Sequence, residues 1–224
     1  MYRYQTLQYP VEFEPLASAS RWMSMRGSRP AALQAFISAA GNLFLADDVP
    51  TMARYIAGKV FHDISRASSH YCSGGIELPA VSHLSLAVGR AREQGGKIAA
   101  VAAAMEAIVP GLRWYQSNTG PFASVNFLDG HAHAYIVGPD GLEQRDCIHL
   151  GVTILAPFTR YPDHRRRYPA AFAALSHMEV RVDESAWMPH RAGGVFFAEG
   201  GSGLALRCTS GPALVLWCER ASGR

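Results

Sequence analysis

The chain has 224 residues, of which 49% are hydrophobic and 17% are charged, and its formal net charge is +3. This composition excludes an intrinsically disordered chain and suits one domain with a sizeable hydrophobic core. The small and scattered positive charge argues against a nucleic-acid partner. No apolar run is long enough to cross a bilayer, so we expect no membrane partner either.

The first residues and the cysteines indicate a cellular location. The opening stretch, "MYRYQTLQYPVEFEP", lacks the apolar segment that secretory signals carry. The four cysteines, Cys72, Cys147, Cys208 and Cys218, show neither CxxC nor zinc-finger spacing. We therefore expect a cytoplasmic protein with free thiols.

The first half has helical periodicity. Pro30 is a good first-turn residue for a helix in "RPAALQAFISAAGNLFLADD". Asp47 or Asp48 is expected to cap the next helix. The apolar residues of that helix share one face, namely Met52, Tyr55, Ile56 and Val60. Two more helices are expected in "LPAVSHLSLAVGRAREQ" and "KIAAVAAAMEAIVPG". Because each helix has one apolar face, the helices must pack on another layer.

From about Pro121 the apolar period changes to two, which is typical of β-strands. "HAHAYIV" is followed by the turn "GPDG" and by "DCIHLGVTILA". In the latter stretch Ile148, Leu150, Val152 and Ile154 should share one face. Further strands are expected in "AALSHMEVRVD", "GGVFFAE", "GLALRC" and "PALVLWCE". The pattern predicts an α+β protein, with a helical region over residues 1–111 packed on a β-sandwich or β-barrel over residues 112–224.

Several stretches resemble the cupin-type dimethylsulfoniopropionate (DMSP) lyases: "FLDGHAHAYIVGPDG", "HLGVTILAPFTRYPDH", "SAWMPHRAGGVFF" and "GPALVLWCER". The resemblance spans roughly residues 112–220, and the helical first half is similar to the region that precedes the barrel in those proteins. It implies a cupin jelly-roll barrel. The fold is its stronger implication, because one fold hosts many activities.

The resemblance also implies a chemistry, the metal-assisted β-elimination of DMSP to dimethyl sulfide and acrylate. In this family a tyrosine base removes the proton next to the carboxylate, while a divalent metal such as Fe, Mn, Ni or Zn binds that carboxylate. The ligands are histidines at i and i+2, a glutamate four residues later and a histidine from a later strand. The base tyrosine lies two residues after the glutamate. The i, i+2 spacing places both imidazoles on one face of a strand.

On this sequence His164 matches the first histidine, and Tyr161 matches a tyrosine that lines the family pocket and is our candidate catalytic residue. The other positions hold Arg166 at the second histidine, Ala170 at the glutamate, Phe172 at the base tyrosine and Leu204 near the last histidine. A protonated guanidinium also repels a nearby cation. We therefore expect the family metal to be absent or weakly bound, and the lyase activity to be weak or lost.

A relocated metal site is the alternative. His131 and His133 share one face of a predicted strand, and His149 lies on the next predicted strand. If that hairpin pairs in register, these imidazoles and His164 converge, and an active metal-dependent lyase is retained. The other interpretation is that "HAHA" forms an amphipathic edge strand with exposed or hydrogen-bonded imidazoles.

The run "YPDHRRRYPAAF" also has two interpretations. It is a solvated charged corner, or Arg166 points into the barrel and holds a carboxylate in a bidentate pair without any metal. In the second interpretation Tyr161 and Tyr168 are hydrogen-bonding walls of the pocket, and the protein binds a small carboxylate. Because cupins often pair through their barrel faces, a structural homodimer is a third alternative.

Overall fold

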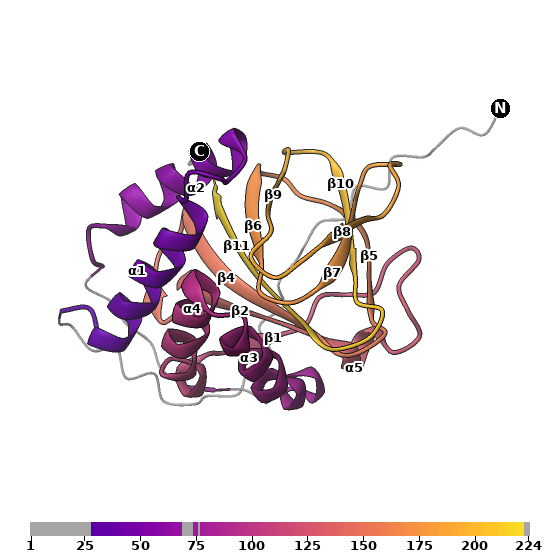
Figure 1. The fold of residues 1–224 in the computed structure, drawn as a ribbon, viewed down its shortest axis with the longest axis horizontal. Helices are drawn as coiled ribbons and strands as arrows, with labels where there is room; N and C mark the ends of the chain where they lie inside the picture. Colours follow the sequence, from indigo (N-terminus) through magenta and orange to yellow (C-terminus); the bar gives the residue numbers. More distant parts are fainter. Residues whose placement is uncertain (1–27, 69–73, 76, 222–224) are drawn as a thin grey trace.

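The computed structural model describes residues 28–68, 74–75 and 77–221, so Cys72 lies outside the described residues. Figure 1 shows helices gathered on one side of a large β-sheet, with a smaller sheet beyond it. Apart from the short helix α5 (Phe127–Gly130), the described helices precede the strands of both sheets. This is the α+β architecture that the change of apolar period predicts.

The described helical elements are α1 (Ala31–Phe44), α2 (Thr51–Ile64), the 3₁₀ turn η1 (Pro79–His83), α3 (Leu84–Glu93), α4 (Gly96–Glu106) and the 3₁₀ turn η2 (Val109–Gly111). Pro30 immediately precedes α1, as its fixed φ favours. Gly95 and Gly96 separate α3 from α4 with φ values of 73° and 55°, in the left-handed region that favours glycine. The chain therefore reverses sharply there, and α3 packs against α4.

The strands form two sheets. The larger has the order β1 (Trp114–Tyr115), β2 (His131–Gly138), β4 (Ile148–Leu155), β11 (Ala213–Arg220), β6 (Ala170–Ala174) and β9 (Val195–Ala198), with β3 (Glu143–Gln144) paired to β2. The smaller has the order β5 (Arg160–Arg165), β10 (Gly203–Arg207), β7 (Met178–Val182) and β8 (Met188–His190). All of these pairs are antiparallel except β2 with β3. The stretch "AALSHMEVRVD", predicted as one strand, is divided between β6 and β7 and so contributes to both sheets.

Helix α2 differs from the sequence prediction in its start and in its buried face. Pro50, and neither Asp47 nor Asp48, occupies the capping position. Met52 and Tyr55 are half exposed, at 50% and 53%. The buried stripe consists of Ala53, Ile56, Ala57, Val60 and Ile64. Because alanine side chains are small, this stripe lets α2 lie close to β6 and β11, on which it packs.

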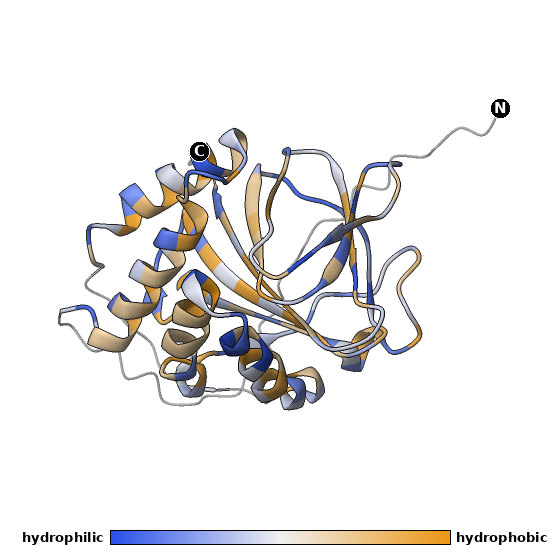
Figure 2. Ribbon diagram, viewed as in Figure 1, coloured by the Kyte–Doolittle hydropathy of each residue, from blue (hydrophilic) through white to orange (hydrophobic). Residues whose placement is uncertain are grey.

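Alternation along the larger sheet divides its side chains between two hydrophobic cores. On β11, Leu214 and Leu216 belong to the core shared with the helices, whereas Val215 and Trp217 belong to the core between the sheets. The predicted alternation of β4 is confirmed, since the core shared with the helices contains Leu150, Val152 and Ile154. Figure 2 shows these apolar strands running between the helices and the smaller sheet. The barrel interior is therefore a separate environment from the face that the helices cover.

Gly151 makes room for Trp217 inside the barrel. The two residues oppose each other in the β4–β11 pair, and a Cβ on Gly151 would overlap the indole ring. The Trp217 Nε1–H donates a hydrogen bond to Thr153 Oγ1 at 3.1 Å. Glycine at this position thus fixes one wall of the barrel interior.

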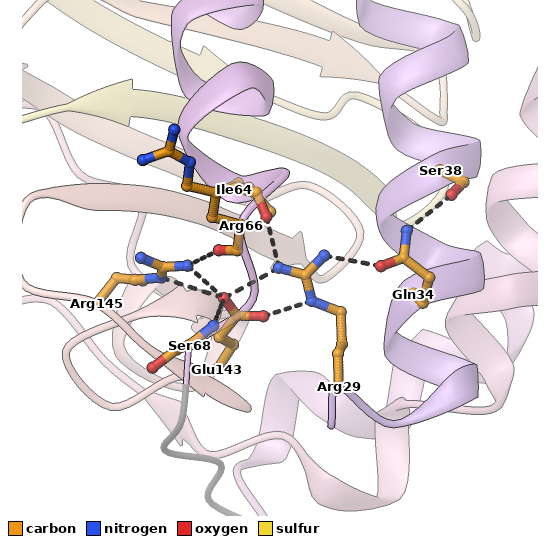
Figure 3. A network of polar contacts seen from close by, with 8 residues as sticks. All are labelled: Arg29, Gln34, Ser38, Ile64, Arg66, Ser68, Glu143 and Arg145. Carbon is orange, nitrogen blue, oxygen red and sulfur yellow. Dashed lines mark hydrogen bonds and ion pairs between the residues drawn. The ribbon is translucent and has the colours of Figure 1, made fainter. Parts of the chain in front are cut away.

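A buried carboxylate joins the helical region to the larger sheet (Figure 3). Glu143 is fully buried and accepts hydrogen bonds from Arg29 Nε at 2.6 Å, from Arg145 Nη2 at 3.0 Å and from the Ser68 backbone N–H at 2.9 Å. Arg29 also donates to the Ile64 carbonyl at 2.5 Å. The residue before Pro30, the end of α2 and the strand β3 are therefore held at one point.

Among the described residues no helix is both long and apolar enough to span a bilayer. Cys147, Cys208 and Cys218 are free thiols, as predicted for them.

Candidate functional site

The barrel interior contains a group of polar and aromatic side chains, which we call the barrel cluster. Its members are Tyr115, His131, His133, Tyr135, His149, Tyr161, His164, Arg166 and Glu219. They come from β1, β2, β4, β5, the residue after β5, and β11. The aromatic rings contact one another in sequence, with centroid distances between 4.7 Å for Tyr161–His164 and 5.7 Å for His131–Tyr161.

Arg166 points into the barrel. Its guanidinium carbon lies 5.3 Å from the ring centroid of Phe172 and 5.3 Å from that of Trp217, two side chains of the core between the sheets. Arg165 and Arg167 are exposed. Both interpretations of the arginine run therefore apply, the solvated corner to the outer arginines and the inward orientation to the middle one.

Arg166 is paired with a carboxylate of the barrel wall. Its Nη2 lies 2.6 Å from Glu219 Oε2, and Glu219 Oε1 lies 3.1 Å from His149 Nδ1. Burial raises the pKa of the Glu219 carboxyl, but the hydrogen bond from His149 and the charge and hydrogen bond of Arg166 outweigh burial and lower that pKa below its ordinary value. Glu219 is therefore ionised and compensates the Arg166 charge.

His131 and His133 are buried and hydrogen-bonded, so "HAHA" is not an exposed edge strand: β2 lies between β1 and β4. His131 Nε2 accepts the Ser117 backbone N–H at 2.8 Å, which places the proton on Nδ1, where it is donated to the Phe127 carbonyl at 2.5 Å. His133 Nδ1 lies 2.7 Å from Thr153 Oγ1, and its Nε2 is buried without a partner among the described residues.

Tyr161 and His164 face the same interior from β5. The Tyr161 hydroxyl donates to Ser117 Oγ at 2.8 Å. Burial raises the pKa of Tyr161, and the Ser117 hydrogen bond and the Arg166 charge oppose this rise without cancelling it. Burial, followed by the Arg166 charge, lowers the pKa of His164 to about 4. At neutral pH Tyr161 is therefore a phenol and His164 a neutral imidazole.

The positions that correspond to the family's metal ligands converge, but their side chains do not fit a metal. Leu204 lies directly opposite His164 in the β5–β10 pair. Ala170, Phe172 and Leu204 all belong to the core between the sheets. An alkyl or phenyl side chain offers no lone pair to a cation, and the Arg166 guanidinium adds a fixed positive charge. His164 is the one family ligand position that retains a donor atom.

The four histidines of the alternative site are not arranged as a metal centre. Both ring nitrogens of His131 are occupied by hydrogen bonds, and both of His149 face oxygen acceptors, Glu219 Oε1 at 3.1 Å and the Asp146 carbonyl at 3.2 Å. The described part of the chain contains no group of three or more His, Cys, Asp or Glu residues that could hold a metal ion. His131, His133 and His164 instead surround the Tyr161 ring.

Two further placements differ from the sequence-based description of the pocket. Tyr168 lies in the turn between β5 and β6, where its ring centroid is 5.4 Å from the Arg167 guanidinium. Within the described part of the chain, no hydrogen bond or ring contact joins Tyr168 to the barrel cluster. Glu219, absent from the predicted site, is its central carboxylate. The sequence feature that could have identified Glu219 is the alternation of β11, which places it on the same face as Val215 and Trp217.

We expect the protein to lose stability as the pH falls from about 6.5 to about 4, because the pKa of His164 is lowered from 6.5 to about 4 in the folded state. In this interval the unfolded chain binds a proton that the folded chain excludes, so the free energy of unfolding rises with pH. The full effect is about 3 kcal/mol at about 1.4 kcal/mol per pKa unit. Urea unfolding at about pH 7 and pH 4.5 measures it.

The matched control is His164→Gln, which has no titratable group at this position. This variant should lose less stability than the native protein over the same interval, since its remaining dependence comes from other groups such as His133, whose pKa burial also lowers. An identical pH dependence of the two proteins would contradict the prediction.

Comparison with known proteins agrees with this architecture. The family model for DMSP lyase matches residues 53–215. A chain from the crystal structures of the DMSP lyases RdDddP and RnDddQII is similar with a TM-score of 0.63 and 19% identity, over 86% of this chain and 94% of that one. DMSP lyase DddQ from Ruegeria pomeroyi DSS-3 is similar with a TM-score of 0.62 and 16% identity, over 87% of this chain and 93% of that one. No curated protein matches the chain.

The structural likeness confirms the predicted fold, a jelly-roll barrel preceded by helices. The match to the family model extends from α2 to β11 and covers well over half of the chain. On that match, the chain belongs to the DMSP lyase family.

Proposed function

We propose that this member of the family binds a small carboxylate in its barrel through Arg166, without a metal, and has lost the family's elimination chemistry. The observation that carries the proposal is the inward guanidinium of Arg166 at the position of a family metal ligand. A guanidinium supplies the positive charge that a metal would otherwise offer to a carboxylate, and it supplies directed hydrogen bonds as well.

Two unpaired polar atoms support a ligand at this position. Arg166 Nη2 donates a hydrogen bond to Glu219. In contrast, Arg166 Nε and His133 Nε2 are buried and have no hydrogen-bond partner among the described residues. Buried polar atoms normally find hydrogen-bond partners, so the site suits a molecule that supplies oxygen atoms. If Thr153 donates its hydroxyl proton to His133 Nδ1, then Nε2 carries a proton and both unpaired atoms are donors to a carboxylate.

The state of Tyr161 supports the loss of elimination. A base that removes a proton next to a carboxylate must itself be deprotonated or close to it. Burial raises the pKa of Tyr161, and Phe172, at the position that the resemblance assigns to the base tyrosine, has no hydroxyl. With no metal-binding set to offset the charge of a developing carbanion, the barrel retains binding groups but lacks a competent base.

We expect propionate to bind the native protein more tightly than propionamide, its neutral analogue of the same shape. Arg166→Lys should weaken propionate binding at least about tenfold, since hydrogen bonds to charged groups contribute about 1.5–3 kcal/mol and lysine lacks the planar fork. Isothermal titration calorimetry measures both affinities. The lysine retains a cation beside Glu219, so the variant is expected to fold.

Arg165→Lys is the matched control, because Arg165 is the exposed neighbour of Arg166. It should bind propionate as the native protein does. Equal binding of propionate by the native protein and Arg166→Lys would refute the carboxylate site. Release of dimethyl sulfide from DMSP, with stoichiometric metal found by elemental analysis, would refute the loss of chemistry and favour an active metal-dependent lyase.

A further inference from the structure

We propose that a surface cavity, at the end of the barrel away from Arg166, binds a small multiply charged oxyanion of the phosphate type. The cavity has a volume of about 360 Å³ and lies between α3 and the loops that follow β6 and precede β9 and β11. The residues used in the argument are Arg90, Ser176, His177, Arg191, Ser210 and Gly211, all of which line it.

The register of the larger sheet separates this cavity from Arg166 and its partner Glu219. Ala170 pairs with Glu219 at one end of the β6–β11 ladder, and Ala174 pairs with Val215 at the other end. The cavity continues from this second end, where the chain leaves β6 through Leu175. A ligand there would contact none of the barrel-cluster residues, because none of them lines the cavity.

The charge of the cavity is one-sided. Arg90 and Arg191 both line it, and none of the described residues that line it is acidic. Neither arginine forms an ion pair within the described residues, whereas Arg92, two positions further along α3, is paired with Glu106 at 3.1 Å. Two guanidinium groups without a protein counter-charge favour an anion that carries more than one charge.

The local backbone shapes the cavity around these groups. Arg90 Nη1 lies where a side chain at position 211 would stand, so Gly211 is what admits the guanidinium. Ser176 Oγ accepts the Leu214 backbone N–H at 3.2 Å, which leaves the serine hydroxyl proton to be donated to a ligand. The Leu175 N–H bonds to the Leu214 carbonyl at 2.8 Å and fixes the loop.

The donors favour a phosphate group over a single carboxylate. A tetrahedral phosphate presents oxygens in several directions and can meet Arg90, Arg191 and the Ser176 or Ser210 hydroxyl at the same time. A carboxylate presents two oxygens in one plane and is satisfied by one guanidinium. The volume is within the range of small-molecule sites, so the phosphate can belong to a larger metabolite.

Titration of the full chain with inorganic phosphate tests the proposal. We expect saturable binding by calorimetry at constant ionic strength set with chloride, so that screening does not change. Arg90→Gln and Arg191→Gln should each weaken phosphate binding at least about tenfold. Both side chains are exposed, so the variants should keep the native melting temperature in chloride.

Arg92→Gln is the matched control on the same helix and should leave phosphate binding unchanged, because Arg92 does not line the cavity. Absence of saturable phosphate binding, or equal affinity in the native protein and both cavity variants, would overturn the proposal. Succinate that binds as tightly as phosphate would overturn the choice of ligand class. Arg166→Lys should retain phosphate binding, so failure of the carboxylate site in the barrel is distinguishable from failure here.

Discussion

Replacing Glu143 with glutamine is expected to lower the free energy of unfolding by about 3–5 kcal/mol, because it breaks a buried ion pair and leaves its partner charged. The Glu143 side chain is fully buried and the Arg29 side chain is only 5% exposed. Glutamine keeps the size of the side chain, but its amide NH2 group replaces one carboxylate oxygen and cannot accept a hydrogen bond from Arg29 or Arg145. Because the same carboxylate also holds the Ser68 N–H, the connection after α2 should loosen together with the residues before α1.

Equilibrium unfolding in urea gives the change in free energy, with Asp47→Asn as the matched control. Asp47 also pairs with an arginine, Arg54, at 3.4 Å, but its side chain is fully exposed. An exposed pair contributes about 0–1 kcal/mol, so the control should be close to the native protein. Similar small losses in both variants would show that Glu143 does not join the helical region to the sheet.

Four substitutions together should raise the divalent metal that the barrel retains to about one ion per chain. They are Arg166→His, Ala170→Glu, Phe172→Tyr and Leu204→His. Each places a donor atom in the barrel interior: Ala170, Phe172 and Leu204 belong to the core between the sheets, Leu204 pairs with His164, and Arg166 points inward. The first also removes the guanidinium whose charge opposes a cation. Glu219 loses its arginine partner in this variant, and its negative charge further favours a bound cation.

Elemental analysis after desalting from Zn²⁺ or Mn²⁺ measures the retained metal. A version that carries Arg165→His in place of Arg166→His tests the role of the inward charge, because it adds the same imidazole at an exposed site and keeps Arg166 in the barrel. That version should retain much less metal. Stoichiometric metal in the native protein, or none in the folded fourfold variant, would contradict this account of the site.

The fold was largely predictable because its signals are local. The change of apolar period separates helices from strands, and the alternation of β4 is visible in four apolar residues at every second position. The face of α2 was predicted wrongly, because large apolar side chains were expected inside. Close packing on β6 selects alanines there instead. The division of "AALSHMEVRVD" between two sheets depends on pairing with β11 and β10, which are distant in sequence.

The site was predictable only where a family pattern marks the positions. Arg166 follows the last residue of β5, and its side chain points inward, whereas Arg165 and Arg167 are exposed. A shift of one residue there would exchange the inward and outward side chains. The chain of contacts from Arg166 through Glu219 to His149 joins residues 53 and 70 positions apart. The alternation of β11 predicts that Glu219 faces inward, but only the pairing of β11 with β4 and β6 shows which residues lie beside it.

The alternation of β11 between two cores has an evolutionary consequence. Neighbouring residues on this strand pack in different cores, since Leu216 belongs to the core shared with the helices while Trp217 lies in the interior of the barrel. Substitutions at the inward positions can therefore alter the barrel interior during evolution while the positions that face the helices stay the same. The same strand can thus keep its contacts with the helices while the chemistry of the barrel interior changes.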